Sequence, residues 1–109
     1  MRVEVISERE QENGWQFSVT YGEHGCDLFL SWADYNLWSP DGTLPPANIA
    51  DAVIRVMLDH GSPEVPVRLD ASLLRRLIDG GDQLVHQQRM EELRESVAVA
   101  EVERKSRVA

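Results

Sequence analysis

His24 and Cys26 are the closest pair of side chains in the sequence whose types could bind a metal or supply a nucleophile. An imidazole beside a thiol can share a metal ion with it, or can activate it as a thiolate. A zinc site needs about three or four protein ligands, whereas His60 and His86 lie far away in the sequence. We therefore expect no metal and no cofactor, with Cys26 as a small core side chain and His24 in a turn. An enzyme or metal protein centred on this pair is the weakest of three functional hypotheses.

Other catalytic patterns are missing from the sequence. No serine lies in a Gly-x-Ser-x-Gly elbow, and the glycines do not form a phosphate-binding loop. Two carboxylate pairs, Asp34 with Asp41 and Asp79 with Asp82, could do acid–base chemistry. Chance pairs of this kind are common in a chain with 19 acidic residues. We expect a protein that is not an enzyme.

The segment from Trp32 to Pro40 is the most distinctive part of the chain, because it combines tryptophan and tyrosine with acidic residues. Rigid aromatic side chains in connecting segments often anchor binding partners. The simpler interpretation is that Trp32 closes the core opposite Trp15 and that the other rings hold the next helix in place. For Trp38 both interpretations stay open. The predicted partner-binding residues are Asp34, Tyr35, Trp38 and Asp41.

A stripe of residues recurs at spacings of four and three near the end of the chain: His86, Met90, Leu93, Val97, Ala100 and Arg104. This is coiled-coil spacing, but the run is shorter than the three to four heptads that make such an assignment safe. The predicted self-association residues are Met90, Leu93, Val97 and Ala100. The alternative is a solvated helix whose first turns pack on the rest of the protein.

The charge of the chain narrows the class of partner. Its formal net charge of -8 and pI near 4.7 argue against direct binding to nucleic acid or to anionic membranes. No apolar run approaches the roughly 18 residues that span a bilayer, and the first residues do not resemble a secretory signal, so we expect a cytoplasmic protein. The acidity is concentrated in residues 10–54, which contain no Lys or Arg and seven acids: Glu10, Glu12, Glu23, Asp27, Asp34, Asp41 and Asp51. A basic partner would therefore meet the amino-terminal half.

The elements that must position these residues begin with three strands. Apolar and polar residues alternate from Val3 to Glu8, over 15–21 and over 26–32. A turn through Gly22 to Gly25 would set an antiparallel register that pairs Tyr21 with Cys26, Val19 with Leu28, Phe17 with Leu30 and Trp15 with Trp32. A turn through residues 9–13 would pair Val5 with Phe17 and Val3 with Val19. The result is a meander with one apolar face that needs a cover.

Helices supply that cover. A broad apolar face predicts a core helix from Pro46 to Gly61. The Ser31 to Asp34 segment has the form of a capping box, which predicts a short helical turn, with a fourth strand over 35–38 as the alternative. After an extended link over 63–69, Asp70 is expected to cap a short helix, and Asp82 a long one that runs to about Arg104.

The predicted fold is therefore α+β: a three-stranded antiparallel meander covered on one face by a core helix, followed by a short helix and a long C-terminal helix. Residues 1–81 form a small α+β domain and residues 82–109 a helical arm. The first functional hypothesis is a protein–protein interaction module that forms a homodimer or a larger assembly through this arm. The alternative is an acidic inhibitor or decoy that binds a basic, nucleic-acid-handling protein.

Overall fold

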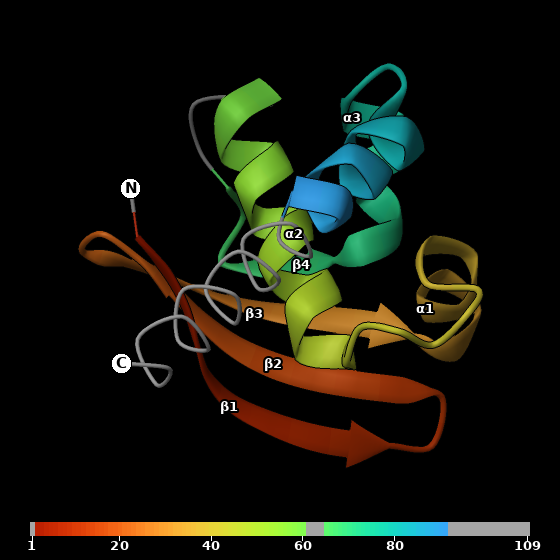
Figure 1. Cartoon of the computed structure of the whole chain (residues 1–109). Helices are drawn as coiled ribbons and strands as arrows, with labels where there is room; N and C mark the ends of the chain where they lie inside the picture. Colours follow the sequence, from red (N-terminus) through yellow and green to blue (C-terminus); the bar gives the residue numbers. More distant parts are fainter. Residues whose placement is uncertain (1, 61–64, 92–109) are drawn as a thin grey trace, which may run out of the picture.

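The structure of the protein is a computed structural model that describes residues 2–60 and 65–91. Four strands form one sheet in the order β1 (Val3–Gln11), β2 (Gly14–Tyr21), β3 (His24–Ser31) and β4 (Arg68–Asp70) (Figure 1). The first three strands are antiparallel, as predicted, and β4 pairs with β3 in parallel. The α+β class is confirmed. The sequence pattern did not predict β4, because its residues read as an extended link.

The β2–β3 register differs from the predicted one by two residues, and the β1–β2 register differs by two up to Val5 and by three from Ser7 on. Tyr21 pairs with His24 and Val19 with Cys26, so only Gly22 and Glu23 form the turn. Gly22 has a φ of +61°, whereas Glu23 has no positive φ. A positive φ at the first central position alone is typical of a type II′ turn, whose twist matches that of the flanking strands. On the other side Val5 pairs with Val19 rather than with Phe17. A shift by two keeps the side chains of β2, of β3 and of β1 up to Val5 on their predicted faces, so the apolar face of the meander is retained.

A bulge in β1 changes which of its side chains face the helices. The register with β2 shifts between Val5, which pairs with Val19, and Ser7, which pairs with Ser18. The extra residue there, Ile6, is exposed. Because side chains alternate along a strand, one inserted residue exchanges the two faces for all that follows. Val3 and Val5 therefore face the core, whereas Ser7 and Arg9 lie on the opposite face.

Gly14 is required where β2 begins. A Cβ atom on this residue would clash with the carbonyl oxygen of Leu30 and would come within 2.8 Å of the Cα of Ser31. Gly14 pairs directly with Ser31, so the missing side chain allows β2 and β3 to approach at this end.

The two predicted helices after the meander are present. Helix α1 (Trp32–Trp38) begins at Ser31, whose hydroxyl accepts a hydrogen bond from the Asp34 amide at 3.1 Å, as the capping-box pattern predicts. The alternative of a strand over 35–38 is wrong. Helix α2 (Pro46–His60) packs its predicted apolar face on the sheet, and seven of its residues are buried: Ile49, Ala50, Ala52, Val53, Ile54, Val56 and Met57.

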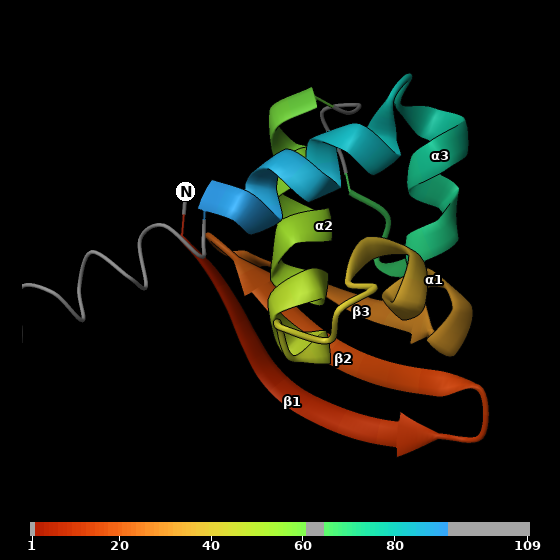
Figure 2. The same cartoon turned by 45° about the vertical axis from the view of Figure 1, so that its right-hand side comes forward.

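The last described elements complete the helical layer. Asp70 caps the turn η1 (Ala71–Leu73), as predicted, by accepting from the Ser72 amide at 2.9 Å, and α3 (Leu74–Leu77) follows directly. A last helical segment, residues 81–91, lies across α2 (Figure 2). Asp82 lies inside its first turn rather than capping it. The rest of the predicted long helix is outside the described residues.

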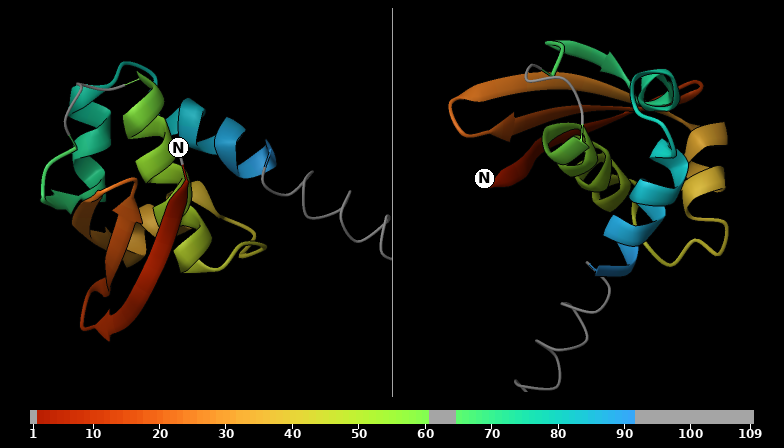
Figure 3. Two further views of the ribbon diagram at one scale, coloured as in Figure 1. Left: turned by 90° about the vertical axis from the view of Figure 1, so that its left-hand side faces the viewer. Right: turned by 90° about the horizontal axis from the view of Figure 1, so that it is seen from above.

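Every described helix lies on one side of the sheet or at its end, and none of them covers the other side, here called the open side (Figure 3). The core forms between the sheet and α2, from side chains such as Phe17, Val19, Leu28 and Leu30. Within residues 2–60 and 65–91, no helix is both long and apolar enough to cross a membrane.

Candidate functional site

Two of the predicted partner-binding residues belong to a cluster of polar contacts within the chain. We call it the Trp38–Arg75 cluster, and its members are Asp34, Trp38, Arg75 and Asp82. Arg75 donates from Nη2 to Asp34 Oδ1 at 2.8 Å and from Nε to Asp82 Oδ1 at 3.0 Å. Trp38 Nε1 donates to the same Asp82 oxygen at 2.8 Å, and the Arg75 guanidinium lies 5.0 Å from the centre of the Trp38 ring. The cluster joins α1, α3 and the 81–91 segment.

Electrostatics in the Trp38–Arg75 cluster favour the charged arginine. Burial acts to lower the pKa of Arg75, but the hydrogen bond and charge of Asp34, followed by those of Asp82, outweigh it and raise the pKa above its ordinary value. The guanidinium forks between two carboxylates and stacks on an aromatic ring, which Lys could not do. Such contacts stabilise the packing of α1, α3 and the 81–91 segment against one another.

Tyr35 and Asp41 are also held within the chain. The Tyr35 hydroxyl donates to the Leu44 carbonyl at 2.7 Å. Asp41 accepts from the amide and the hydroxyl of Thr43, and these bonds, aided by Arg89 at 3.3 Å, lower the pKa of its carboxyl. The two members of the predicted acid pair, Asp34 and Asp41, are thus bound to different arginines.

The four predicted partner-binding residues are therefore near one another in the fold but differ in exposure. Trp38 is 2% exposed and Asp34 is 7% exposed, so little of either side chain is accessible in this conformation. Only Asp41 is well exposed. Trp32, predicted to close the core, contacts Trp15 with ring centroids 4.2 Å apart, yet it remains 42% exposed. Partner binding by these residues stays a prediction.

The predicted self-association stripe is only partly described. Met90 is 37% exposed on the 81–91 segment, while Leu93, Val97 and Ala100 lie outside the described residues. Self-association through this stripe also stays a prediction.

His24 and Cys26 lie on the same strand but do not form a reactive pair. Cys26 is buried opposite Val19, not Tyr21 as predicted, and burial, with a smaller contribution from the charge of Asp27, raises its thiol pKa to about 11. His24 is exposed and its ring stacks on Tyr21. A protonated, enclosed thiol is a poor nucleophile. In the described part of the chain, no three His, Cys, Asp or Glu side chains come together as metal ligands.

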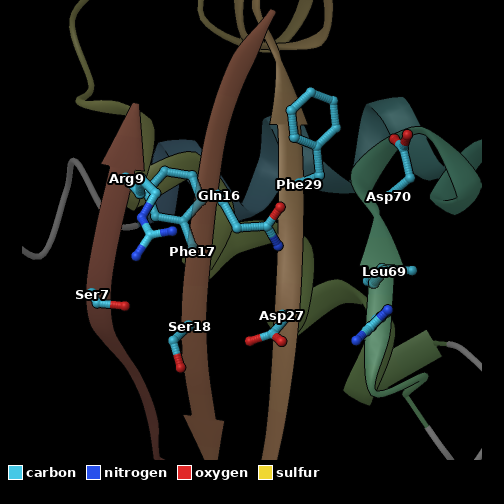
Figure 4. Close-up of a pocket in the computed structure, with 10 residues that line it drawn as sticks. Ser7, Arg9, Gln16, Phe17, Ser18, Asp27, Phe29, Leu69 and Asp70 are labelled. Carbon is cyan, nitrogen blue, oxygen red and sulfur yellow. The ribbon is translucent and has the colours of Figure 1, made fainter. Parts of the chain in front are cut away.

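The open side of the sheet carries a second group of polar and charged side chains, which was not predicted from the sequence. A depression of about 580 Å³ lies over all four strands (Figure 4). Eight residues whose side chains face this side line it in two rows that cross the sheet, and we call them the open-face site. The first row is Arg9, Gln16, Phe29 and Asp70, and the second is Ser7, Ser18, Asp27 and Arg68.

The pairing register defines these rows. Arg9 pairs with Gln16, Gln16 with Phe29, and Phe29 with Asp70. Directly paired residues share a face of the sheet, and residues two apart on a strand do too, so the second row lies beside the first. Buried residues such as Phe17, Leu28 and Leu69 alternate with them and face the helices.

The charged groups of the open-face site make almost no bonds to other described side chains. Among the described residues, no ion pair or side-chain hydrogen bond holds Arg9, Asp27 or Arg68; only Asp70 is engaged, through its bond to the Ser72 amide. The two arginines and two aspartates sum to zero charge in a chain of net charge -8. The site combines free charges of both signs with hydroxyls, an amide and a half-buried ring, Phe29.

Comparison of the chain with protein families, with curated proteins and with solved structures finds no significant match. Function therefore has to be argued from the site. The sequence signals that could have located the open-face site are weak: polar residues at every second position of β2 and β3 mark an open face, but the partners on β1 and β4 depend on a bulge and on a parallel pairing.

Proposed function

We propose that this protein is a non-enzymatic protein-interaction module that binds another polypeptide chain through the open-face site. The observation that carries the proposal is that no described helix covers the open side of the sheet, where Arg9, Asp27 and Arg68 have no ion partner among the described residues. Charged and polar side chains on a rigid sheet can recognise a partner with little rearrangement. The Trp38–Arg75 cluster, by contrast, is occupied by contacts within the chain.

The chemistry of the site favours a macromolecular partner. Its side chains lie in two rows across four strands, and the outermost strands are about 14 Å apart at a spacing of about 4.8 Å. A depression that is wide and open suits a protein surface better than a small molecule, which proteins usually enclose in a pocket. Buried nucleophiles and metal-binding groups play no part in this function.

The test is a capture experiment from native extract with two charge-swapped variants. Exchanging Asp27→Arg together with Arg68→Asp leaves the net charge unchanged but reverses the local pattern of the open-face site. Exchanging Arg76→Asp together with Asp79→Arg makes the same change at exposed residues of the helical layer. We expect the first variant to lose polypeptides that wild type and the second variant retain. Equal retention by all three proteins would refute the proposal.

A second candidate function is the acidic inhibitor that binds a basic partner, and the edge of the sheet supports it. Glu8, Glu10 and Glu12 are exposed on β1 and its hairpin, and no ion pair neutralises them within the described residues. Such a complex would depend strongly on salt, because screening shortens the range of each attraction. Neutralising the three residues to glutamine should weaken it, whereas a complex unaffected between about 50 and 200 mM salt would exclude this function.

A further inference from the structure

Opposite charges stand at opposite edges of the first row of the open-face site. Arg9 lies on β1 and Asp70 on β4, in line with each other across the sheet. Three strand spacings separate them by about 14 Å, which is too far for an ion pair within one chain. Both side chains are exposed, and Arg9 has no ion partner within the described residues, so both charges are accessible to a partner from another chain.

A second copy of the chain would supply both partners at once. A twofold axis that runs parallel to the strands, midway between β2 and β3, places β1 of one copy over β4 of the other when the open faces meet. Arg9 then faces Asp70 of the second copy, and symmetry repeats the pair. Sheets that pack face to face keep their strands roughly aligned, which this axis allows.

The inner positions of the two rows complement each other under the same symmetry. Gln16 lies over the Phe29 ring of the second copy, and the Ser18 hydroxyl can donate to its Asp27 carboxylate. At the edge, Ser7 lies over Arg68 and can accept from it. No like charges meet.

The other twofold axis in this plane runs perpendicular to the strands and also makes two ion pairs, because it brings Arg68 over Asp70 of the second copy. It leaves Arg9 over Ser7, without an ion partner, and it adds one unfavourable contact. It exchanges the two rows, and so brings the Asp27 carboxylate over the Phe29 ring of the second copy. The face of an aromatic ring carries negative potential, which repels a carboxylate. The strand-parallel axis avoids this contact.

The distribution of charge over the molecule also favours a second copy of the chain as the partner of the open-face site. Two copies of a chain with net charge -8 repel each other, and most of all through acidic surfaces such as the β1 hairpin. The open-face site is neutral and alternates in sign, so two copies can meet there with attraction. We infer that the open-face site binds a second copy of this chain about the strand-parallel twofold axis. This inference rests on the proposed function, since it names the partner.

The experiment measures the mass of the full chain in solution over a range of concentrations, by sedimentation or light scattering. Wild type is expected to dimerise. Arg9→Glu places two glutamates against two aspartates, and Asp70→Arg places two arginines against two arginines. Because each of two repeated pairs loses about tenfold, either substitution should raise the dimer dissociation constant at least about a hundredfold.

The decisive step is to mix the two substituted proteins. In one edge pair of the mixed dimer, the glutamate introduced by Arg9→Glu faces the arginine introduced by Asp70→Arg. In the other edge pair, the native Asp70 of the first protein faces the native Arg9 of the second. Both pairs are attractive again, so we expect dimerisation to return in the mixture. A structural effect of either substitution could not be repaired in this way.

Matched controls use the helical layer. Arg76→Glu and Asp79→Arg make the same changes in net charge at exposed positions and should leave the mass unchanged, alone or mixed. Asp70→Asn keeps an acceptor for the Ser72 amide and removes only the charge, so it separates the loss of the cap from the loss of the ion pair.

Three results would overturn the inference: a wild-type chain that is monomeric at every concentration, a dimer that survives both charge reversals, or a mixture that does not recover. Survival of the dimer would assign self-association elsewhere, as the predicted C-terminal stripe does. A monomer that still captures another polypeptide in a manner sensitive to the Asp27 and Arg68 exchange would refute the second copy and leave the proposed function in place.

Discussion

The Trp38–Arg75 cluster and the open-face site differ in whether the chain itself supplies ion partners for their charged side chains. On the helix-covered side, Arg75 is bonded to two carboxylates and stacked on a tryptophan ring, so its charge is balanced inside the chain. On the open side, Arg9 and Arg68 have no ion partner among the described residues. Both regions contain arginine and aspartate, so residue type alone does not separate a structural charge from a binding charge. What distinguishes the two kinds of charge is whether the chain itself supplies an ion partner for the side chain.

The largest effect that would test this contrast is Arg75→Met. Removing the guanidinium leaves the buried Asp34 carboxylate and the Asp82 carboxylate without their cation, and it exposes the Trp38 ring to a changed environment. We expect the free energy of unfolding to fall by about 3 kcal/mol, measured by denaturant titration. Arg75→Lys keeps the charge but cannot donate to both carboxylates in the same planar geometry, so its free energy of unfolding should lie between those of wild type and Arg75→Met. A loss below about 1 kcal/mol would show that the cluster does not hold the helices together.

The next effect concerns Cys26, which faces the core while its neighbour Asp27 faces the open side. Its thiol pKa is raised from 9.0 to about 11, so the unfolded chain loses this proton before the folded chain does. Stability from the buried thiol is therefore fully present below about pH 9 and is lost as the pH rises toward 11. Relative to Cys26→Ala, we expect wild type to lose about 2 kcal/mol over this interval. If the free energies of unfolding of wild type and Cys26→Ala changed in parallel with pH, this prediction would be wrong.

Much of the covered side could be predicted from the sequence, because its signals are local. The Ser31 cap, the helix over 46–60 and the alternation in β2 and β3 all depend on neighbours within a few residues. The hairpin register could not be predicted in the same way, since a period of two looks identical after a shift of two residues. Gly22 decides between the two registers, because its positive φ permits a two-residue turn.

The open-face site escaped prediction because its parts meet through non-local pairing. Arg9 would face the core if β1 had no bulge, and nothing in its alternating sequence marks the inserted residue. Strand β4 has only three residues, too few to show a period, and its partner lies about 40 residues earlier in the chain. The burial of Trp38 also depends on a non-local contact, since Asp82, 44 residues away, accepts a hydrogen bond from its indole N–H.

A smaller effect is expected at Asp70, the one charge of the open-face site that also has a bond within the described chain. Asp70→Ala removes the acceptor for the Ser72 amide and should lower the free energy of unfolding by about 1 kcal/mol. Asp70→Asn should leave stability nearly unchanged, because an amide oxygen caps as well as a carboxylate does. If Asn were as destabilising as Ala, the charge of Asp70 would itself stabilise the fold, and the contrast between the two sides would weaken.

The smallest effect is expected for Arg9→Gln, and it is the sharpest test of the contrast. Arg9 is exposed on the bulged edge strand and has no ion partner among the described residues, so its charge contributes nothing specific to the monomer. Measured at protein concentrations too low for self-association, its free energy of unfolding should stay within about 0.5 kcal/mol of wild type. At high concentration a dimer that uses Arg9 would be stabilised by mass action, so the same substitution would then lower the melting temperature. An effect that depends on concentration assigns Arg9 to a partner, whereas an equal loss at every concentration would assign it to the fold.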